Sequence, residues 1–303
     1  MASTYRAVEI SSPGVFSLVE RKVTVLGAGQ VRIRVEACGV CHSDAATVEA
    51  QFPNLSYPRV PGHEVIGRIE EVGPGVTAWK VDQRVGVGFF GGEDGTCETC
   101  CRGDTAYCQN PIITGVTSDG GYAEMMIAEA RALALIPEEL KSEDAAPLVC
   151  AGITTFNALR NTGRAGDTVA IQGIGGLGHL GVQYAKKMGF RTVAIGFGPD
   201  KEHLAPKLGA HIYIDAKAED ARVLKKLAEE LGLKKLNFQV LRRTTATLAQ
   251  RMGTVKDLQA IMAHSKPDTT AGVYMQPIEE SVKQTLDAIY AELTRRPKLK
   301  KVS

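Results

Sequence analysis

The sequence lacks any apolar run near the ~20 residues that a helix needs to cross a bilayer, which argues against a transmembrane protein. Its start, MASTYRAVEI, has neither the basic segment nor the apolar core of a secretory signal peptide. Its seven cysteines are an odd number, and four of them lie within residues 97–108, which favours metal ligation over disulfide bonds. We therefore expect a soluble cytoplasmic protein from a reducing compartment.

The end of the chain is poor in residues that are common before it. Residues 222–303 contain no cysteine and only three of the 32 glycines, and they hold 16 of the 36 basic residues but 8 of the 34 acidic ones. The net charge of +2 is therefore the sum of an acidic body and a basic tail. Such asymmetry indicates a separate segment, which either faces a polyanion or exposes a solvated helical surface.

Two patterns of apolar residues divide the chain before residue 222. Residues 5–90 alternate apolar and polar positions between turns, which predicts an all-β barrel or sandwich. Further on, three short apolar segments alternate with two helical ones, at residues 167–173, 179–189, 191–197, 199–209 and 210–215. This alternation predicts a parallel, doubly wound sheet. After residue 222 only helical patterns follow, so the predicted sheet stops at three strands.

Four side chains that can hold a metal are spread over three motifs. GVCHSD supplies Cys41, PGHEVIG supplies His63 and Glu64, and PLVCAG supplies Cys150. Two thiolates and an imidazole are the donor set of a catalytic zinc ion with one open position. Each residue alone has another reading, because a single cysteine is more often a small core residue and a single histidine a satisfied polar group.

In this order the motifs resemble those of zinc-dependent alcohol dehydrogenases of the medium-chain dehydrogenase family, and the similarity extends over about residues 4–220. The resemblance implies a GroES-like β domain followed by a Rossmann domain. It implies that zinc is held by Cys41, His63 and Cys150, with Glu64 as an alternative ligand and Asp44 as the carboxylate that orients His63. It also implies hydride transfer between a primary alcohol or aldehyde and NAD or NADP, with zinc as the Lewis acid.

The same resemblance gives Ser43 the role of carrying a proton away from the alcohol. Many members end this relay with a histidine at the position that is Glu49 here. The resemblance therefore implies a proton path that differs from theirs or ends in solvent. By residue type alone, Ser43 also suits an ordinary turn.

The segment DGTCETCCRGDTAYC indicates a second metal site. The family's structural zinc lobe has four cysteines spaced C-x2-C-x2-C-x7-C, and this spacing falls here on Asp94, Cys97, Cys100 and Cys108. Aspartate oxygen is an accepted zinc ligand, so three thiolates and one carboxylate can hold the ion. Two alternatives stay open: Cys101 replaces a ligand if the loop shifts, or the lobe is weakly metallated or empty.

The segment IQGIGGLGHLG follows a short apolar strand and leads into a helix, which is the context of a dinucleotide-binding loop. Gly173 allows the tight turn, Gly175 and its neighbour Gly176 expose backbone to a pyrophosphate, and Gly178 permits close packing of helix on strand. The N-terminus of the helix offers free N–H groups and a favourable dipole to phosphates.

The next strand lacks the acid that reads the ribose of NAD. Its expected position is Gly196, while Asp200 is predicted to cap the following helix. Without the acid the site does not repel a 2′-phosphate, yet the nearest cation is Lys201. NAD and NADP therefore both stay open.

Residues 222–293 resemble the C-terminal part of tyrosine recombinases, the phage integrases. Matched by motif, the catalytic positions of that family are Arg242, His264 and Tyr274, and Gln239 stands where a histidine is usual. The first arginine and the lysine of a working recombinase have no counterpart upstream, so strand transfer is not expected. Surface helices that only pack or hydrate are the other reading.

Together these patterns predict an α/β protein with an all-β GroES-like domain with a zinc lobe at 1–153, a truncated Rossmann parallel sheet at 154–221, and an all-α segment with a basic tail at 222–303. The predicted function is that of an alcohol dehydrogenase, homo-oligomeric where it folds and impaired by replacement of the second half of the Rossmann domain. The alternative is a non-enzymatic fusion protein whose tail binds DNA weakly, with an affinity that falls steeply with salt.

Overall fold

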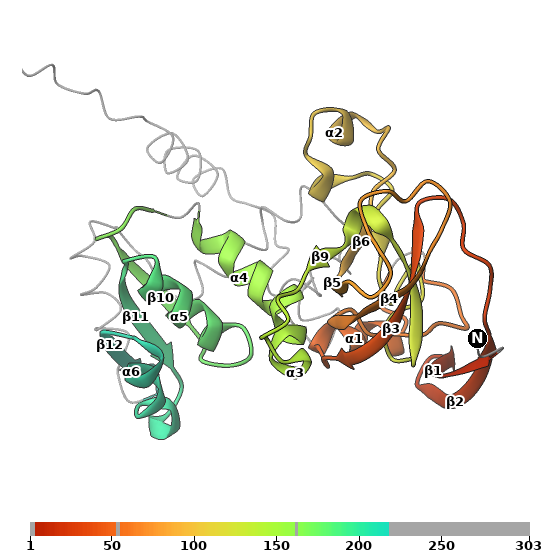
Figure 1. Ribbon diagram of the computed structural model, residues 1–303. Coiled ribbons are helices and arrows are strands. Elements are labelled where there is room, and N and C mark those ends of the chain that lie inside the picture. Colours follow the sequence, from red (N-terminus) through yellow and green to blue (C-terminus); the bar gives the residue numbers. More distant parts are fainter. Residues whose placement is uncertain (1–3, 53–54, 161–162, 218–303) are drawn as a thin grey trace, which may run out of the picture. The chain divides into compact units, whose positions relative to one another are not determined.

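The computed structural model describes residues 4–52, 55–160 and 163–217 (Figure 1). Contacts divide the chain after Arg222, and every described residue belongs to the first of the two units. Among these residues, none of the helices combines the length and the apolar character needed to span a membrane. The helices predicted after residue 222 lie outside the described residues.

A five-stranded antiparallel sheet forms the frame of the N-terminal part. In spatial order its strands are β8 (Met125–Glu129), β3 (Gln30–Cys38), β4 (Val65–Val72), β5 (Arg84–Val87) and β9 (Ala134–Leu135). The alternation predicted for these segments buries one face, where Val31, Ile33 and Val85 are fully enclosed. Each such aliphatic side chain contributes about 1.5–3 kcal/mol of burial free energy, so this face holds the sheet together.

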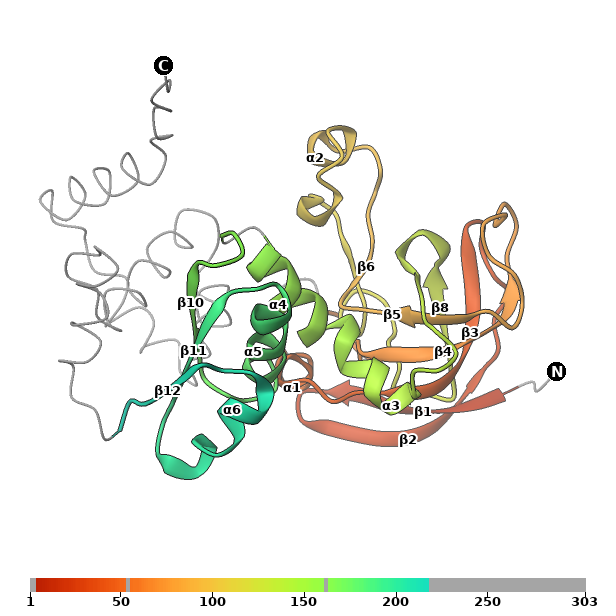
Figure 2. The same cartoon turned by 60° about the vertical axis from the view of Figure 1, so that its left-hand side comes forward.

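Shorter elements surround the sheet. A hairpin joins β1 (Thr4–Ser12) and β2 (Val15–Lys22), and α1 (His42–Val48) follows β3. A lobe with α2 (Glu98–Cys101) and η1 (Thr105–Tyr107) is inserted between β6 (Phe90–Gly92) and β7 (Ile112–Ile113), which pair with each other. Figure 2 shows this lobe projecting away from the sheet. The all-β prediction for residues 5–90 is therefore right for the strands of that segment but did not foresee α1.

One connecting segment runs back over the sheet. After β8 come η2 (Ala130–Ala132), β9, α3 (Ser142–Ala145), η3 (Ala146–Val149) and α4 (Ala151–Arg160). Ala145 and Ala146 are buried against Ile66 of β4. Their small side chains let this segment lie close to the sheet, and it leads directly to Cys150.

The C-terminal described part is a three-stranded parallel sheet. Strands β10 (Thr168–Gln172), β11 (Arg191–Gly196) and β12 (Ile212–Asp215) pair in this order. The chain crosses between them through α5 (Gly178–Lys187), and through η4 (Pro199–Lys201) with α6 (Leu204–Leu208). Val182 of α5 and Ala194 of β11 are completely buried in one apolar cluster. The predicted alternation of strand and helix is confirmed.

Candidate functional site

The first candidate site lies where three separate segments of the chain meet. Cys41 is the residue before α1, His63 and Glu64 directly precede β4, and Cys150 joins η3 to α4. One ligand atom from each of the four lies within 4.8 Å of the others, and the sulfurs of Cys41 and Cys150 are 4.0 Å apart. Two thiolates on a tetrahedral zinc ion are separated by about 3.8 Å, given Zn–S bonds of about 2.3 Å.

His63 provides a direct check of whether the site suits a metal. Its Nδ1 lies 3.0 Å from Oδ1 of Asp44, so Nε2 is the ring atom left for another partner. That Nε2 is buried and has no hydrogen-bond partner among the residues that the structure describes. A buried polar atom without a partner costs free energy unless a ligand satisfies it, so this nitrogen fits a metal ligand.

The carboxylate of Asp44 is itself held from two sides. Its Oδ2 accepts hydrogen bonds from the Cys41 N–H at 2.9 Å and from the Tyr122 hydroxyl at 2.8 Å. Burial raises the pKa of Asp44, but His63 and these two donors outweigh it, so the pKa falls below its ordinary value. Tyr122 was not predicted as a site residue, because it lies 78 positions from Asp44 and stands in no motif that we recognised.

Charge in the metal-free site is concentrated on one sulfur. Contact with Cys150 and with His63 lowers the pKa of Cys41 to about 3, and the contact with that thiolate raises the pKa of Cys150 strongly. Burial would lower the pKa of His63, but Asp44 and Cys41 raise it to about 9. A metal ion that binds here therefore has to displace protons from His63 and from Cys150.

We expect Tyr122→Phe to weaken metal binding at this site about 10-fold, the lower end for a partner of a metal ligand's carboxylate. The change removes one hydrogen bond to Asp44 and leaves the ring in place. Competition with a chromophoric chelator measures the affinity. An affinity equal to that of the unmodified chain would show that Tyr122 only packs.

The two residues considered for the proton path lie at opposite ends of α1. Ser43 is half-buried in the first turn, whereas Glu49 is exposed at the other end of this helix and is bonded by Gln51. A proton path that differs from that of the relatives or ends in solvent stays a prediction. The Phe89 ring packs edge-on against the ring of His63, with the two ring centroids 5.1 Å apart, and is an apolar neighbour of this ligand.

The lobe gathers the second predicted set. Ligand atoms of Asp94, Cys97, Cys100 and Cys108 lie within 4.8 Å of one another, with the Cys97 sulfur 3.4 Å from that of Cys100 and 3.9 Å from that of Cys108. Backbone N–H groups of Asp94, Gln109 and Asn110 point at the sulfurs, as they do toward thiolates. Cys101 is exposed and contacts the Thr96 carbonyl instead, so it is not part of this group.

Asp94 has a structural task besides any metal ligation. Its Oδ1 accepts from the N–H groups of Cys97 and Thr96, both at 2.9 Å, and its Oδ2 accepts from the Asn110 amide at 2.8 Å. These bonds, the one from Cys97 first, hold the pKa of Asp94 far below its ordinary value. A carboxylate has about four lone-pair sites, so a metal can still be accepted on Oδ2.

Replacing Asp94 separates these two tasks. Asp94→Asn keeps an oxygen for the two backbone N–H groups but loses the anionic ligand, and we expect lobe zinc affinity to fall by about 10-fold or more. Asp94→Cys restores the four-thiolate set and should bind zinc more tightly than the unmodified chain. Zinc per chain after dialysis against a graded chelator measures both. Equal retention by all three chains would exclude Asp94 as a ligand.

The glycine-rich loop between β10 and α5 has the geometry of a phosphate cradle. Gly173 has φ +83°, and a Cβ on Gly178 would lie only 1.6 Å from the Gly173 carbonyl oxygen. Around Gly175 and Gly176 no heavy atom among the described residues lies within 4 Å of where a Cβ would stand. The backbone of these two residues is therefore open to a ligand, next to the N-terminus of α5.

At the end of β11 the place of an acidic side chain is filled by a tyrosine. A Cβ on Gly196 would lie 2.2 Å from the Tyr213 hydroxyl, which donates to the Gly198 carbonyl at 2.7 Å. Asp200 lies inside η4 and makes no capping hydrogen bond, so the prediction that it caps the helix is wrong. The turn before η4 is held by Asp215 instead, whose carboxylate accepts a hydrogen bond from the Gly198 N–H at 2.6 Å. Lys201 is exposed in η4.

The recombinase-like positions Arg242, His264 and Tyr274 lie outside the described residues, as does all of the basic tail. The predictions for that segment, including DNA binding, therefore stay predictions.

Comparison with known proteins gives this arrangement a class. Residues 27–138 match the alcohol dehydrogenase GroES-like domain. In this chain the domain is followed by a three-stranded parallel sheet, and the matched part of the chain is similar to alcohol dehydrogenases of the zinc-type medium-chain family.

Individual relatives agree with this class. The alcohol dehydrogenase patD of Aspergillus clavatus is 48% identical over 193 residues, which are 63% of this chain and 50% of the relative. The crystal structure of CAD from Helicobacter pylori, in complex with NADP(H), has 29% identity and a TM-score of 0.65, over 73% of this chain and 67% of that one. A cobalt- and zinc-bound thermostable alcohol dehydrogenase from Pyrobaculum aerophilum has 32% identity and a TM-score of 0.64, over 70% and 65%. The chain thus spans about half the length of the first of these relatives.

Proposed function

We propose that this chain is an oxidoreductase of the zinc-dependent alcohol dehydrogenase type, which moves hydride between a primary alcohol or aldehyde and NAD or NADP. The observation that carries the proposal is the buried Nε2 of His63, which has no hydrogen-bond partner in the described part of the chain and lies beside the sulfurs of Cys41 and Cys150. The open glycine-rich loop supports the cofactor half of the reaction.

Each residue of the first site has a distinct task in this proposal. Cys41, Cys150 and Nε2 of His63 hold zinc, which when bound supplies a Lewis acid that polarises the oxygen of the substrate. Asp44 keeps the imidazole oriented through Nδ1, and Glu64 lies close enough to the other three residues to be an alternative ligand. Phe89 presents an apolar face that keeps water from the reacting carbon. Ser43 takes the hydroxyl proton, which then follows a different path or leaves to solvent, because Glu49 stands where many relatives have histidine.

In the cofactor site, the backbone at Gly175 and Gly176 and the first N–H groups of α5 would bind the pyrophosphate. Gly196 provides no acid to bind the ribose hydroxyls or to repel a 2′-phosphate, so both NAD and NADP are accepted in this proposal. Asp94, Cys97, Cys100 and Cys108 would hold a second zinc ion that orders the lobe.

The test is to purify the chain, count zinc, and follow aldehyde reduction with NADH and NADPH separately. The proposal expects two zinc ions per chain, one for each ligand group, and loss of nicotinamide absorbance with aldehyde. We expect slow turnover, because the edge of β10 is unpaired among the described residues. A chain that binds neither zinc nor a reduced nicotinamide cofactor would overturn the proposal and favour the non-enzymatic alternative with a weakly DNA-binding tail.

A further inference from the structure

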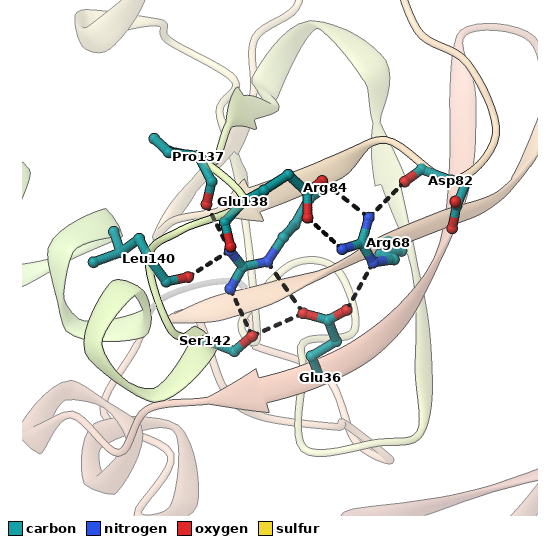
Figure 3. Close-up of polar contacts among 8 residues, drawn as sticks. All are labelled: Glu36, Arg68, Asp82, Arg84, Pro137, Glu138, Leu140 and Ser142. Carbon is teal, nitrogen blue, oxygen red and sulfur yellow. Dashed lines mark hydrogen bonds and ion pairs between the residues drawn. The ribbon is translucent and has the colours of Figure 1, made fainter.

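A buried arginine of β5, outside the metal site, reaches the segment that carries Cys150 (Figure 3). The Arg84 guanidinium donates through Nη1 to the carbonyls of Pro137, at 2.6 Å, and of Leu140. Its Nη2 donates to the Ser142 hydroxyl at 2.7 Å. Arg84 is 4% exposed, and it therefore fixes the backbone just before α3 and the first residue of α3.

The charge of Arg84 is balanced by Glu36 on the neighbouring part of the sheet. Glu36 Oε2 lies 3.2 Å from Arg84 Nε and accepts from the Ser142 hydroxyl at 2.7 Å. On its other side, Glu36 Oε1 lies 3.1 Å from Nε of Arg68, which also bonds Glu138. A planar guanidinium that meets a carboxylate and several carbonyls at once holds its partners in one geometry, which a lysine cannot do.

The far end of the same segment rests on the same strand. A Cβ on Gly88, just after β5, would lie 2.4 Å from the Val149 carbonyl oxygen, and one on Gly86 would lie 2.8 Å from the Val149 side chain. Val149 is the residue before Cys150. Residues 137–149 are thus held at their start by Arg84. At their end, the Val149 carbonyl packs closely against the backbone of Gly88, which has no side chain to keep it away.

We propose that Arg84 is a positioning residue for the metal site: by fixing the path of residues 137–149, it sets the place of the Cys150 sulfur beside Cys41. The proposal rests on the proposed function, since it assigns that site to a metal ion. Arg84 itself touches no ligand atom in the interactions described; it acts through Pro137, Leu140 and Ser142.

Cobalt(II) titration of the full chain tests this, because cobalt reports thiolate and imidazole ligation in its visible absorption spectrum. Arg84→Lys keeps the charge but loses the fork, and Arg32→Lys is its matched control, since Arg32 is also a buried arginine of the sheet but bonds Glu71 and the Thr24 carbonyl, which lie outside residues 137–149. The lobe is an internal control, because it binds its own ion.

We expect Arg84→Lys to weaken cobalt binding at the Cys41 site by about 10- to 100-fold and to alter its spectrum, with the lobe site unchanged. Arg32→Lys should leave both sites as they are. A second variant reaches the same sulfur from the other end: Gly88→Ala pushes the Val149 backbone and should reproduce the altered spectrum.

Three outcomes would overturn the inference. Arg84→Lys equal to Arg32→Lys in affinity and spectrum means that Arg84 has no role in positioning. Loss of both metal sites in Arg84→Lys, with the Gly88→Ala spectrum normal, means a general role in stability. An unmodified chain without cobalt at the Cys41 site refutes the proposed function as well, which distinguishes the two failures.

Discussion

A chain with serine in place of Cys41 is expected to retain one zinc ion and to lose aldehyde reduction by about three orders of magnitude. The Cys41 thiolate is one of the two sulfur ligands that the site offers to zinc, 4.0 Å from the sulfur of Cys150. Serine keeps the size but is not ionised at neutral pH, so zinc loses a strong ligand. A Lewis acid is worth several kcal/mol of transition-state stabilisation, and each 1.36 kcal/mol is tenfold in rate, which gives about 10³.

Cys38→Ser is the matched control for this substitution. Cys38 is also a half-buried cysteine at the end of β3, but its sulfur contacts the Gly39 carbonyl and does not belong to the group of ligands. Burial raises the pKa of Cys38 to about 12, so it stays a neutral thiol. Both zinc ions should remain in Cys38→Ser, as counted by atomic emission. Two zinc ions in Cys41→Ser would remove Cys41 from the site.

The strands and helices of the parallel sheet could be predicted from the sequence, because short-range patterns of apolar residues determine where each one lies. The apolar stretches around β10, β11 and β12 alternate with amphipathic helices, and a parallel sheet is the arrangement that buries all of them. The β-rich part was harder to predict. Helix α1 has only seven residues, and the residue at its N-cap, Cys41, is not of a type that favours helix starts.

The residues of the metal site likewise fall into those that motifs predicted and those that were missed. Cys41, His63 and Cys150 were predicted from a resemblance of motifs, and the structure brings their ligand atoms together. Tyr122 and Arg84 were missed because they act through partners that lie 78 and 53 to 58 positions away in the sequence. At Gly196 the sequence indicated that an acid is missing, but only the packing of Tyr213 gives the reason, since its hydroxyl occupies the space that a side chain would need.

A single methyl group at Gly178 should weaken the binding of NADH by about 100-fold. Alanine there would place its Cβ 1.6 Å from the Gly173 carbonyl oxygen, so the backbone of the turn must move. The moved backbone is the one that would donate N–H groups to the pyrophosphate. Each hydrogen bond to a charged group is worth about 1.5–3 kcal/mol, so two lost bonds correspond to about 100-fold or more in affinity.

Gly181→Ala separates this effect from a general change in α5. It lies in the same helix, but its Cβ would meet Ile171 at 3.5 Å, an ordinary van der Waals distance, and alanine is the better helix former. Titration of NADH fluorescence should therefore give Gly181→Ala an affinity close to that of the unmodified chain, and zinc content should be the same in both variants because the metal ligands lie on other segments. Unchanged NADH binding in Gly178→Ala would mean that the cofactor does not use this loop, and the nucleotide half of the proposed reaction would then fail while the metal half stood.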